Sequence, residues 1–342
     1  MGSPEHENNF PDETSPGSDL PNNDAMGNDL PDDALAPDLA AVAAAEYPGR
    51  AGFVSIVGKP NVGKSTLMNQ LVGERLSIIT SKAHTTRHRI MGILNGTHEG
   101  EEFQLIYSDT PGIIVPRYKL HESMMSSVRG SIEDADVILF VTDIFEQYDE
   151  EDAIQRLQKT DVPVILLINK IDLATHQEVD EKIAHWQELF QAAQIIPISA
   201  LNAFNIDKLF DAIITRLPHH PPFFPKDELT DKPERFFASE IIREKIFLNY
   251  KKEVPYSSEV IITGFKERDD MIIISSEILV ERATQRAILL GEGGRMIKKT
   301  GIMAREELER FFNKKVFLET FVKVEPDWRN KERALKRFGY DE

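Results

Sequence analysis

A glycine-rich octapeptide gives this sequence its clearest chemistry. Gly58-Lys59-Pro60-Asn61-Val62-Gly63-Lys64-Ser65 matches G-x-x-x-x-G-K-[ST], and the flanking runs FVSIV and TLMNQLVG predict a strand before it and a helix after it. Glycines let backbone N–H groups cradle phosphate oxygens, and the helix N-terminus adds a favourable dipole. We therefore expect this loop and Thr66 to bind nucleotide phosphates, with Lys64 on the β- and γ-phosphates and the Ser65 hydroxyl on Mg²⁺.

Three shorter motifs follow, each at the end of a predicted strand, and together they predict that the base is guanine. Asp109-Thr110-Pro111-Gly112, followed by Ile113, offers a carboxylate to hold Mg²⁺ through water and an amide that can sense the γ-phosphate. In Asn169-Lys170-Ile171-Asp172, Asp172 can accept hydrogen bonds from guanine N1 and the exocyclic amine, a donor pair that adenine lacks. Ser199-Ala200 would place a backbone amide near guanine O6. Because ligands of open α/β sheets bind at strand carboxyl ends, the order of the motifs carries this inference.

The residues that would support hydrolysis are less evident. We favour Thr86 over Thr85 as the residue that completes the Mg²⁺ shell when GTP is bound, and the alternative is an ordinary entry into a strand. Ras-like switches carry a water-orienting glutamine after the glycine of the second motif, but Ile113 and Ile114 stand there. The predicted catalytic residues are Lys64, Asn61, Thr86 and Gly112.

Asn61 resembles the asparagine that helps to hold a monovalent cation in the potassium-activated branch of the GTPase superfamily. A K⁺ there would occupy the place of an arginine finger and would make a slow GTPase K⁺-stimulated. The alternative is that Asn61 only shapes the loop. Arg87, His88 and His121 are further candidates, but isolated basic side chains are more often solvated than catalytic.

The pattern of apolar runs predicts two domains of different architecture. From Gly52 onward, strands such as DVILFVTDI alternate with helix-like stretches at 150–159, 177–194 and 205–217, which indicates a doubly wound, mainly parallel α/β sheet. Proline-rich residues 218–233 predict a linker. Beyond it we expect a helix at 234–251, two antiparallel strands, a glycine cluster, a helix interrupted at Gly301, a strand and a basic tail.

The glycine cluster fits the GXXG loop of a KH domain, an α+β RNA-binding fold. Such a loop clamps about four nucleotides of single-stranded backbone, and the order of the surrounding elements supports the assignment to type II. Glu292 departs from the pattern, since the middle of this loop is commonly basic. The predicted RNA-binding residues are Gly291, Glu292, Gly293, Gly294, Arg295, Ile297, Lys298 and Lys299.

Charge is distributed unevenly over the 342 residues, whose net charge is −17. Residues 1–50 carry 11 acidic side chains and one basic, whereas residues 282–340 carry 15 basic and 8 acidic, which suits nucleic-acid binding by the C-terminal part alone. The absence of cysteine excludes disulfides, cysteine-ligated zinc and thiol catalysis. No apolar run reaches the roughly 18 residues of a membrane span, so we expect a soluble protein.

The combination of GKPNVGKS, TTRHRI, DTPG, NKID and SA with a C-terminal GXXG unit and DWRNKERALKRFGY resembles the Era family of GTPases over about residues 50–340. The resemblance implies a monomer that binds GTP, GDP and Mg²⁺. It also implies binding near the 3′ end of 16S ribosomal RNA and assistance to 30S subunit assembly. It implies a cytoplasmic location and leaves open peripheral association with the inner face of the cell membrane.

Two features depart from the family pattern: the acidic N-terminal tail, and Ile114 where a histidine is common. The predicted division is an acidic disordered tail at 1–48, a GTPase domain at 49–217, the linker at 218–233 and a KH domain with its basic tail at 234–342. Two other functions stay open, an RNA chaperone that binds GTP but scarcely hydrolyses it and a peripheral membrane GTPase. GTP turnover in K⁺ and Na⁺ tests the former, and liposome sedimentation tests the latter.

Overall fold

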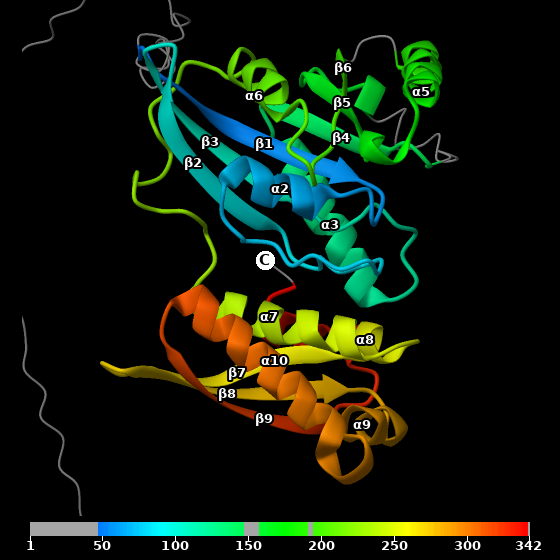
Figure 1. Cartoon of the computed structure of the whole chain (residues 1–342), viewed down its shortest axis with the longest axis vertical. Coiled ribbons are helices and arrows are strands. Elements are labelled where there is room, and N and C mark those ends of the chain that lie inside the picture. Colours follow the sequence, from blue (N-terminus) through cyan, green and yellow to red (C-terminus); the bar gives the residue numbers. More distant parts are fainter. Residues whose placement is uncertain (1–46, 147–156, 191–193, 341–342) are drawn as a thin grey trace, which may run out of the picture.

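The computed structural model describes residues 47–146, 157–190 and 194–340, which form the two domains seen in Figure 1. Almost all of the predicted acidic tail and most of the predicted helix at 150–159 lie outside the described residues. The first domain contains, in chain order, β1 (Arg50–Gly58), α2 (Lys64–Val72), β2 (Ile90–His98), β3 (Glu101–Asp109), α3 (Lys119–Glu133), β4 (Val137–Asp143), β5 (Val164–Asn169), η1 (Ile171–Leu173), α5 (His176–Leu189), β6 (Gln194–Pro197) and α6 (Ile206–Ile214).

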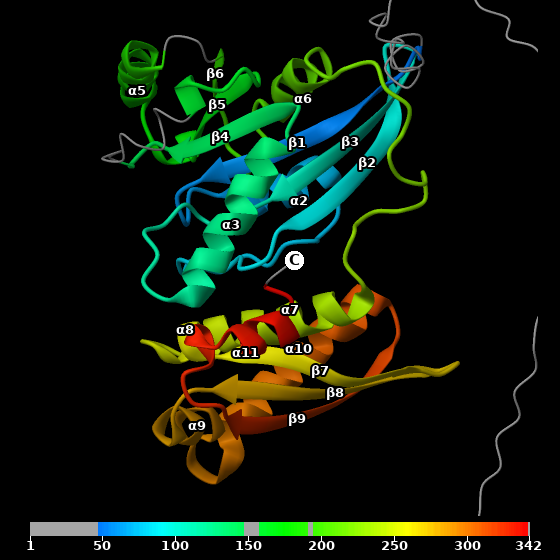
Figure 2. The same ribbon diagram turned by 180° about the vertical axis from the view of Figure 1, so that it is seen from behind.

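The sheet of the first domain has the strand order β2-β3-β1-β4-β5-β6, and every neighbouring pair is parallel except β2 and β3. Helices α2 and α6 cover one face, and α3 and α5 cover the other (Figures 1 and 2). β4 is buried at every position, as expected of a strand between two helical layers. This architecture confirms the predicted doubly wound, mainly parallel sheet.

The second domain contains α7 (Glu234–Asn249), α8 (Val254–Ser257), β7 (Glu259–Glu267), β8 (Met271–Val280), α9 (Ala283–Leu290), η2 (Glu292–Gly294), α10 (Arg295–Phe312), β9 (Lys315–Val324), η3 (Trp328–Asn330) and α11 (Glu332–Arg337). Its sheet has the order β7-β8-β9, with β7 and β8 antiparallel and β8 and β9 parallel. α7, α9 and α10 pack on this sheet around one apolar core. The second domain confirms the predicted α+β KH fold.

Two helix predictions were wrong in their extent. α10 runs through Gly301 without interruption, because its buried face at Thr300, Ala304 and Leu308 offsets the cost of about 1 kcal/mol that one glycine imposes on a helix. α5 ends at Leu189, short of the predicted residue 194, because Gln194 already belongs to β6 and pairs with β5. In both cases tertiary packing overrides the local pattern.

The proline-rich segment 218–233 lies along the edge of the first sheet. Ile93 of β2 donates its N–H to Leu229 O (2.9 Å), and Gly92 forms a bridge with Thr230. The Gln104 side chain donates to Phe224 O (2.8 Å). This segment is therefore fixed to the first domain by hydrogen bonds.

The segment that follows β9 turns back to the first domain. Trp328, Leu335 and Tyr340 are buried in the same apolar cluster as Leu120 and Met124 of α3. Figure 2 shows α11 on the side of the second domain that faces α3. The predicted basic tail thus packs between the two domains. It contains buried apolar residues as well as charged ones, and a count of charges alone did not indicate this packing.

Candidate nucleotide site and RNA-binding loop

The glycine-rich loop leaves β1 at Gly58 and enters α2 at Lys64, as the strand–loop–helix pattern predicts. Gly63 has a φ of 101°, in the left-handed region, and a Cβ at this position would lie 2.2 Å from the Asn169 amide nitrogen. Only glycine fits there. The loop is therefore held in the conformation that turns backbone N–H groups toward an anion.

Lys64 is buried inside this loop. Its ammonium group donates to the carbonyl oxygens of Gly58 (3.1 Å) and Lys59 (2.8 Å). Burial lowers the pKa of Lys64 to about 8, and the nearby Asp109 opposes the shift. A bound phosphate would stabilise the charged form of Lys64, so the site is prepared for an anionic ligand.

Three side-chain oxygens converge where the sequence predicts Mg²⁺. Ser65 Oγ donates to Asp109 Oδ2 (2.7 Å) and lies 2.9 Å from Thr86 Oγ1. Asp109 is fully buried, which raises its pKa, and its Oδ1 has no hydrogen-bond partner among the described residues. A carboxylate oxygen without a partner beside two hydroxyls suits a hard cation such as Mg²⁺. The residues present therefore fit the ion, which would neutralise phosphate charge when bound.

Gly112 passes against the phosphate loop. A Cβ on Gly112 would lie 2.7 Å from the Pro60 nitrogen, and the next amide, that of Ile113, donates to Gly58 O (3.0 Å). The side chains of Ile113 and Ile114 are half-buried against the core next to α3. Neither can orient water, so the structure supplies no replacement for the missing glutamine at these two positions.

The two remaining motifs are tied together by side-chain hydrogen bonds. Asn169 donates to Val62 O (2.8 Å) and accepts from the Ala200 amide (3.0 Å), so it connects the phosphate loop to the end of β6. Ser199 Oγ donates to Asp172 Oδ1 (2.6 Å) and thereby orients the carboxylate predicted to read guanine. Asn169 thus contributes to the site by holding the loops in place.

One cavity of about 370 Å³ joins these features. Asp109, Asp172, Ser199 and Ala200 are not among its lining residues, whereas the loop between α2 and β2 (residues 73–89, the α2–β2 loop) forms one wall that sequence reasoning missed. The only sequence signal for this wall is its position just before Thr85-Thr86. The cavity is lined by Pro60, Asn61, Gly63, Lys64, Ser65, Thr66, Ile78, Ile79, Thr80, Ser81, His84, Thr85, Thr86, Gly112 and Lys170.

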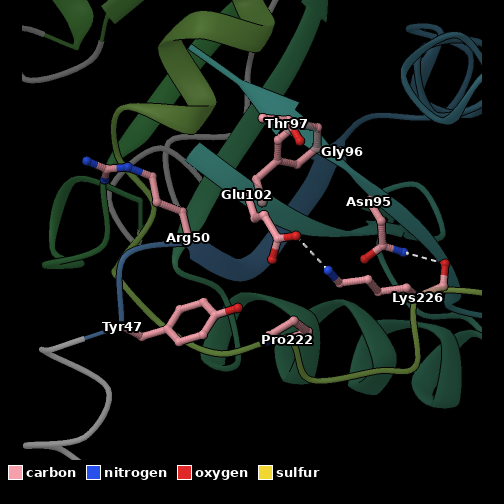
Figure 3. Close-up of a pocket in the computed structure, with 9 residues that line it drawn as sticks. Tyr47, Arg50, Asn95, Gly96, Thr97, Glu102, Pro222 and Lys226 are labelled. Atoms are coloured by element: carbon pink, nitrogen blue, oxygen red, sulfur yellow. Dashed lines mark hydrogen bonds and ion pairs between the residues drawn. The ribbon is translucent and has the colours of Figure 1, made fainter. Parts of the chain in front are cut away.

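A second cavity, of about 220 Å³, lies at the opposite end of β1 (Figure 3). Its charged groups already have partners: Lys226 Nζ lies 2.8 Å from Glu102 Oε1, and Arg50 donates to Leu217 O (2.7 Å). The phosphate loop and the predicted Mg²⁺ ligands Ser65 and Thr86 line the larger cavity and not this one, so we assign the nucleotide to the larger cavity.

The three other basic candidates are not part of the lining of the nucleotide cavity. Arg87 is buried and forms an ion pair with Glu259 of the second domain (2.8 Å). The His88 ring stacks on Tyr340 with 4.2 Å between centroids, and burial lowers the pKa of His88 to about 4. Burial also lowers the pKa of His121 to about 4. None of the three lines the cavity.

Asn61 contacts the α2–β2 loop. It has a φ of 67°, and with its amide oriented to satisfy both neighbours it donates to Lys82 O (2.8 Å) and accepts from the Ala83 amide (3.2 Å). Asn61 therefore connects the phosphate loop to the wall of the cavity that carries Thr86.

The GXXG loop separates α9 from α10 at the end of the second domain that is remote from the first (Figure 1). Gly291, Gly293 and Gly294 all have φ between 58° and 76°, the left-handed region that favours glycine. Glu292 and Arg295 are exposed and form an ion pair with each other (2.7 Å). The acidic residue at the centre of the loop thus neutralises one of its own basic neighbours.

A groove of about 300 Å³ runs beside this loop, between α10 and β9. It brings together the predicted residues Ile297 and Lys298, while Lys299 is exposed outside it. Apolar and basic groups side by side suit the bases and the backbone of a single strand. The groove is lined by Ile297, Lys298, Gly301, Ile302, Arg305, Leu318 and Thr320.

A phosphate loop and guanine-reading motifs at the carboxyl ends of a doubly wound sheet define a P-loop GTPase, here joined to a KH domain. Comparison with known families agrees: a model described as "50S ribosome-binding GTPase" matches residues 53–170, and one described as "KH domain" matches residues 253–329. GTPase Era of Geotalea daltonii is 43% identical over 293 residues, which cover 85% of this chain and 97% of that protein. The chain therefore belongs to the Era family of GTPases, and it hydrolyses GTP as members of that family do.

Similarity extends to a plastid relative and to solved structures. The chloroplastic GTPase ERA-like protein of Oryza sativa is 43% identical over 85% of this chain and 69% of its own length. A crystal structure of Era with MgGDPNP and nucleotides 1506–1542 of 16S ribosomal RNA matches with a TM-score of 0.81 and 41% identity, covering 85% of this chain and 99% of that one. An Aquifex aeolicus Era variant bound to GDP and AlF4⁻ matches with a TM-score of 0.80, 41% identity and the same coverage.

Proposed function

We propose that this protein is a GTP-hydrolysing switch that binds 16S ribosomal RNA near its 3′ end and assists assembly of the 30S subunit. The support is one chain that carries both a nucleotide cavity and a groove beside the GXXG loop. Over both domains this chain resembles the Era structure containing MgGDPNP and 16S RNA. The description that mentions the 50S subunit belongs to a model that matches the first domain alone. We therefore take the small subunit as the partner.

The observation that carries the catalytic assignment is the convergence of Ser65, Thr86 and Asp109 oxygens next to Lys64. In this proposal the Ser65 and Thr86 hydroxyls and the Asp109 carboxylate would hold Mg²⁺, which would neutralise phosphate charge. Lys64 would bind the β- and γ-phosphates. Backbone N–H groups of Gly58–Thr66 cradle the phosphates, and the Gly112 amide senses the γ-phosphate. Ser65→Ala should reduce Mg²⁺-dependent GTP turnover by roughly 100-fold. Ser239→Ala, which lies in α7 of the second domain, serves as the control.

Base selection rests on Asp172, which Ser199 orients. Asp172→Asn replaces an acceptor by a donor, so it should weaken GTP binding by at least about 100-fold and favour xanthosine triphosphate, whose second carbonyl can accept a hydrogen bond. Competition binding with both nucleotides measures this exchange. Equal loss of both affinities would show that Asp172 only supports the fold.

Slow, K⁺-stimulated turnover is the expected kinetic behaviour. Asn61 lies against backbone carbonyls of the α2–β2 loop, and carbonyl oxygens are suitable ligands for a monovalent cation next to the phosphates. GTP turnover in KCl should exceed turnover in NaCl at equal ionic strength, and Asn61→Ala should remove the difference. Equal rates in both salts would leave Asn61 with the role of connecting two loops.

A second function is an RNA chaperone that binds GTP but scarcely hydrolyses it. The half-buried Ile113 and Ile114, which cannot orient water, favour it. The discriminating measurement is steady-state GTP turnover with and without an RNA of 16S nucleotides 1506–1542. Tight GTP binding with negligible turnover under every condition would favour the chaperone.

We further propose a cytoplasmic monomer with functional units at 49–217 and 234–342. The helices of the described ranges include none that is long and apolar enough to cross a membrane. Liposome sedimentation tests whether the protein also binds the inner membrane surface, and light scattering tests the monomeric state.

A further inference from the structure

The N-terminal segment carries a short motif that recurs every ten residues. A large apolar residue is followed by proline and then by aspartate or asparagine in Phe10-Pro11-Asp12, Leu20-Pro21-Asn22 and Leu30-Pro31-Asp32. Residues 1–46 contain no other large apolar residue followed by proline, and they hold 11 acidic side chains with no lysine or arginine. The constant spacing favours three copies of one binding element, which we name the apolar–proline motifs.

Each motif places an apolar side chain next to negative charge. The carboxylates that flank the apolar–proline pairs are those of Asp12, Asp19, Asp29 and Asp32. A residue before proline favours extended conformations, and an extended peptide is the form that lies along a groove. The motifs therefore suit a groove that offers apolar surface and positive charge side by side.

The groove between α10 and β9 (the α10–β9 groove) offers that combination. Ile302 is 44% exposed in its lining, and Lys298 and Arg305 lie on the same face of α10, one turn before it and one turn after it. Arg305 pairs with Glu309 (3.0 Å), whereas Lys298 forms no ion pair within the residues that the structure describes. An apolar side chain can therefore pack on Ile302 while the carboxylate beside it meets the charge of Lys298.

The charges of the two segments also complement each other. Residues 282–340, which contain α10 and β9, carry 15 basic and 8 acidic side chains, in contrast to the acidic segment 1–46. Attraction between exposed charges extends over roughly one Debye length, which is about 10 Å at 0.1 M salt. We therefore expect the attraction to be strong at low salt and weak at high salt.

The N-terminal segment is long enough to reach the groove of its own molecule. Tyr47 is the first described residue, and β1 begins just after it, at the end of the first domain remote from the second (Figures 1 and 2). Two compact domains of about 170 and 110 residues have a combined length of about 75 Å. Phe10 and Leu20 lie 37 and 27 residues before Tyr47, and extended chains of those lengths span up to about 130 and 95 Å.

We propose that the apolar–proline motifs bind in the α10–β9 groove of the same molecule and compete there with RNA. One motif occupies the groove at a time, with its apolar residue against Ile302 and its carboxylate toward Lys298, and the other copies favour rebinding. The competition rests on the proposed function, whereas the contact itself needs no RNA. The apparent affinity for RNA is then reduced to the fraction of molecules whose groove is open.

The first test measures the Kd of an RNA of 16S nucleotides 1506–1542 for the full-length protein at low salt. The triple variant Phe10→Ser, Leu20→Ser and Leu30→Ser keeps every charge of the segment but loses the apolar contacts. We expect this variant to bind RNA about 5- to 10-fold more tightly than the parent, which corresponds to an open fraction of about 10–20% in the parent. The ratio of the two Kd values should fall toward one as KCl rises from about 50 to 200 mM.

The matched control changes three apolar residues of the same segment that no proline follows: Met26→Ser, Leu35→Ser and Leu39→Ser. This variant also loses apolar surface and should keep the Kd of the parent. Equal tightening in both triple variants would overturn the assignment to the apolar–proline motifs. Unchanged RNA binding in both would overturn the competition.

The second test detects the contact without RNA. The chain has no cysteine, so Leu20→Cys combined with Ile302→Cys gives a single pair of thiols, which diamide joins where the two residues meet. The comparison pair is Leu20→Cys with Leu189→Cys, because Leu189 at the end of α5 is 40% exposed, much like Ile302. Peptide mapping of the full-length monomer should show joining of the first pair roughly tenfold faster than joining of the second.

The two tests separate this inference from the proposed function. Equal rates of joining in the two pairs would overturn the groove as the binding site. Joining between two molecules instead of within one would overturn the assignment to the same molecule. A parent protein in which the first pair joins quickly but which binds no RNA overturns the proposed function and leaves the contact in place.

Discussion

The proposed nucleotide site is assembled from segments far apart in the sequence, whereas the proposed RNA-binding loop consists of consecutive residues between two helices. Lys64 and Asp109 are buried in the nucleotide site, and their pKa values are shifted by burial. Glu292 lies within the proposed RNA-binding loop and Arg295 follows it, and both side chains are exposed. Charges act strongly where water is excluded and weakly where it is not, so single substitutions should have large effects at the first site and small ones at the second.

The largest expected effect is that of Lys64→Ala. Removing the buried ammonium group from the β- and γ-phosphates should lower GTP turnover by roughly 100- to 1,000-fold, as losses of single electrostatic contacts in enclosed sites do. Single-turnover kinetics measure the change. RNA binding in the absence of nucleotide should stay the same, and a parallel loss of RNA binding would mean that the two regions do not fold independently of this contact.

Gly293→Asp should have an intermediate effect. Gly293 has a φ of 58° and open space where a Cβ would lie, so aspartate introduces modest strain but places a negative charge where RNA phosphates approach. RNA affinity should fall roughly tenfold with GTP turnover in the absence of RNA unchanged. Fluorescence anisotropy with labelled RNA gives the affinity. A loss below twofold would place the RNA elsewhere on the domain.

The packing between the two domains at His88, whose ring stacks on Tyr340, should weaken in acid. The folded-state pKa of His88 is about 4, below the ordinary value of 6.5, because burial favours the neutral ring. The stability that His88 contributes is therefore present above pH 6.5 and is lost as the pH falls from 6.5 through 4, by about 2 kcal/mol after allowance for its partial exposure. Denaturant titrations between pH 7 and 5 measure the slope, which His88→Phe should reduce.

The smallest expected effect is that of Glu292→Gln. This change removes an exposed negative charge and frees Arg295, so RNA binding should tighten about two- to threefold at low salt and less at high salt. Affinities at roughly 50 and 200 mM KCl would reveal it. Weaker binding in Glu292→Gln would indicate that Glu292 contacts the RNA directly.

Residues that act within one motif were predictable, because strand–loop–helix order fixes their geometry. Lys64, Ser65 and Gly63 lie together for that reason, and Gly291–Gly294 do so as well. The two fold classes were also predictable. The continuous apolar run of β4 and the order of helices and strands in the second domain can be read from the local sequence, without information on distant contacts. Glu292 was recognisable as an exception for the same reason.

Features that depend on packing between distant segments were not predictable. The direction of the Arg87 side chain is set by acceptors in α8 and β7, which the sequence near Arg87 does not indicate. The cavity wall at Ile78–His84 has no motif, and the continuity of α10 through Gly301 depends on its buried face. A short motif encodes the atoms that touch a ligand, but the contacts that hold it in place come from the whole fold.

The packing of Trp328, Leu335 and Tyr340 against α3 has a consequence for biosynthesis. A ribosome makes α3 well before it makes these residues, and the entire second domain is synthesised in between. The part of the first domain that packs against these three residues therefore lacks this cover on the nascent chain until that later segment emerges.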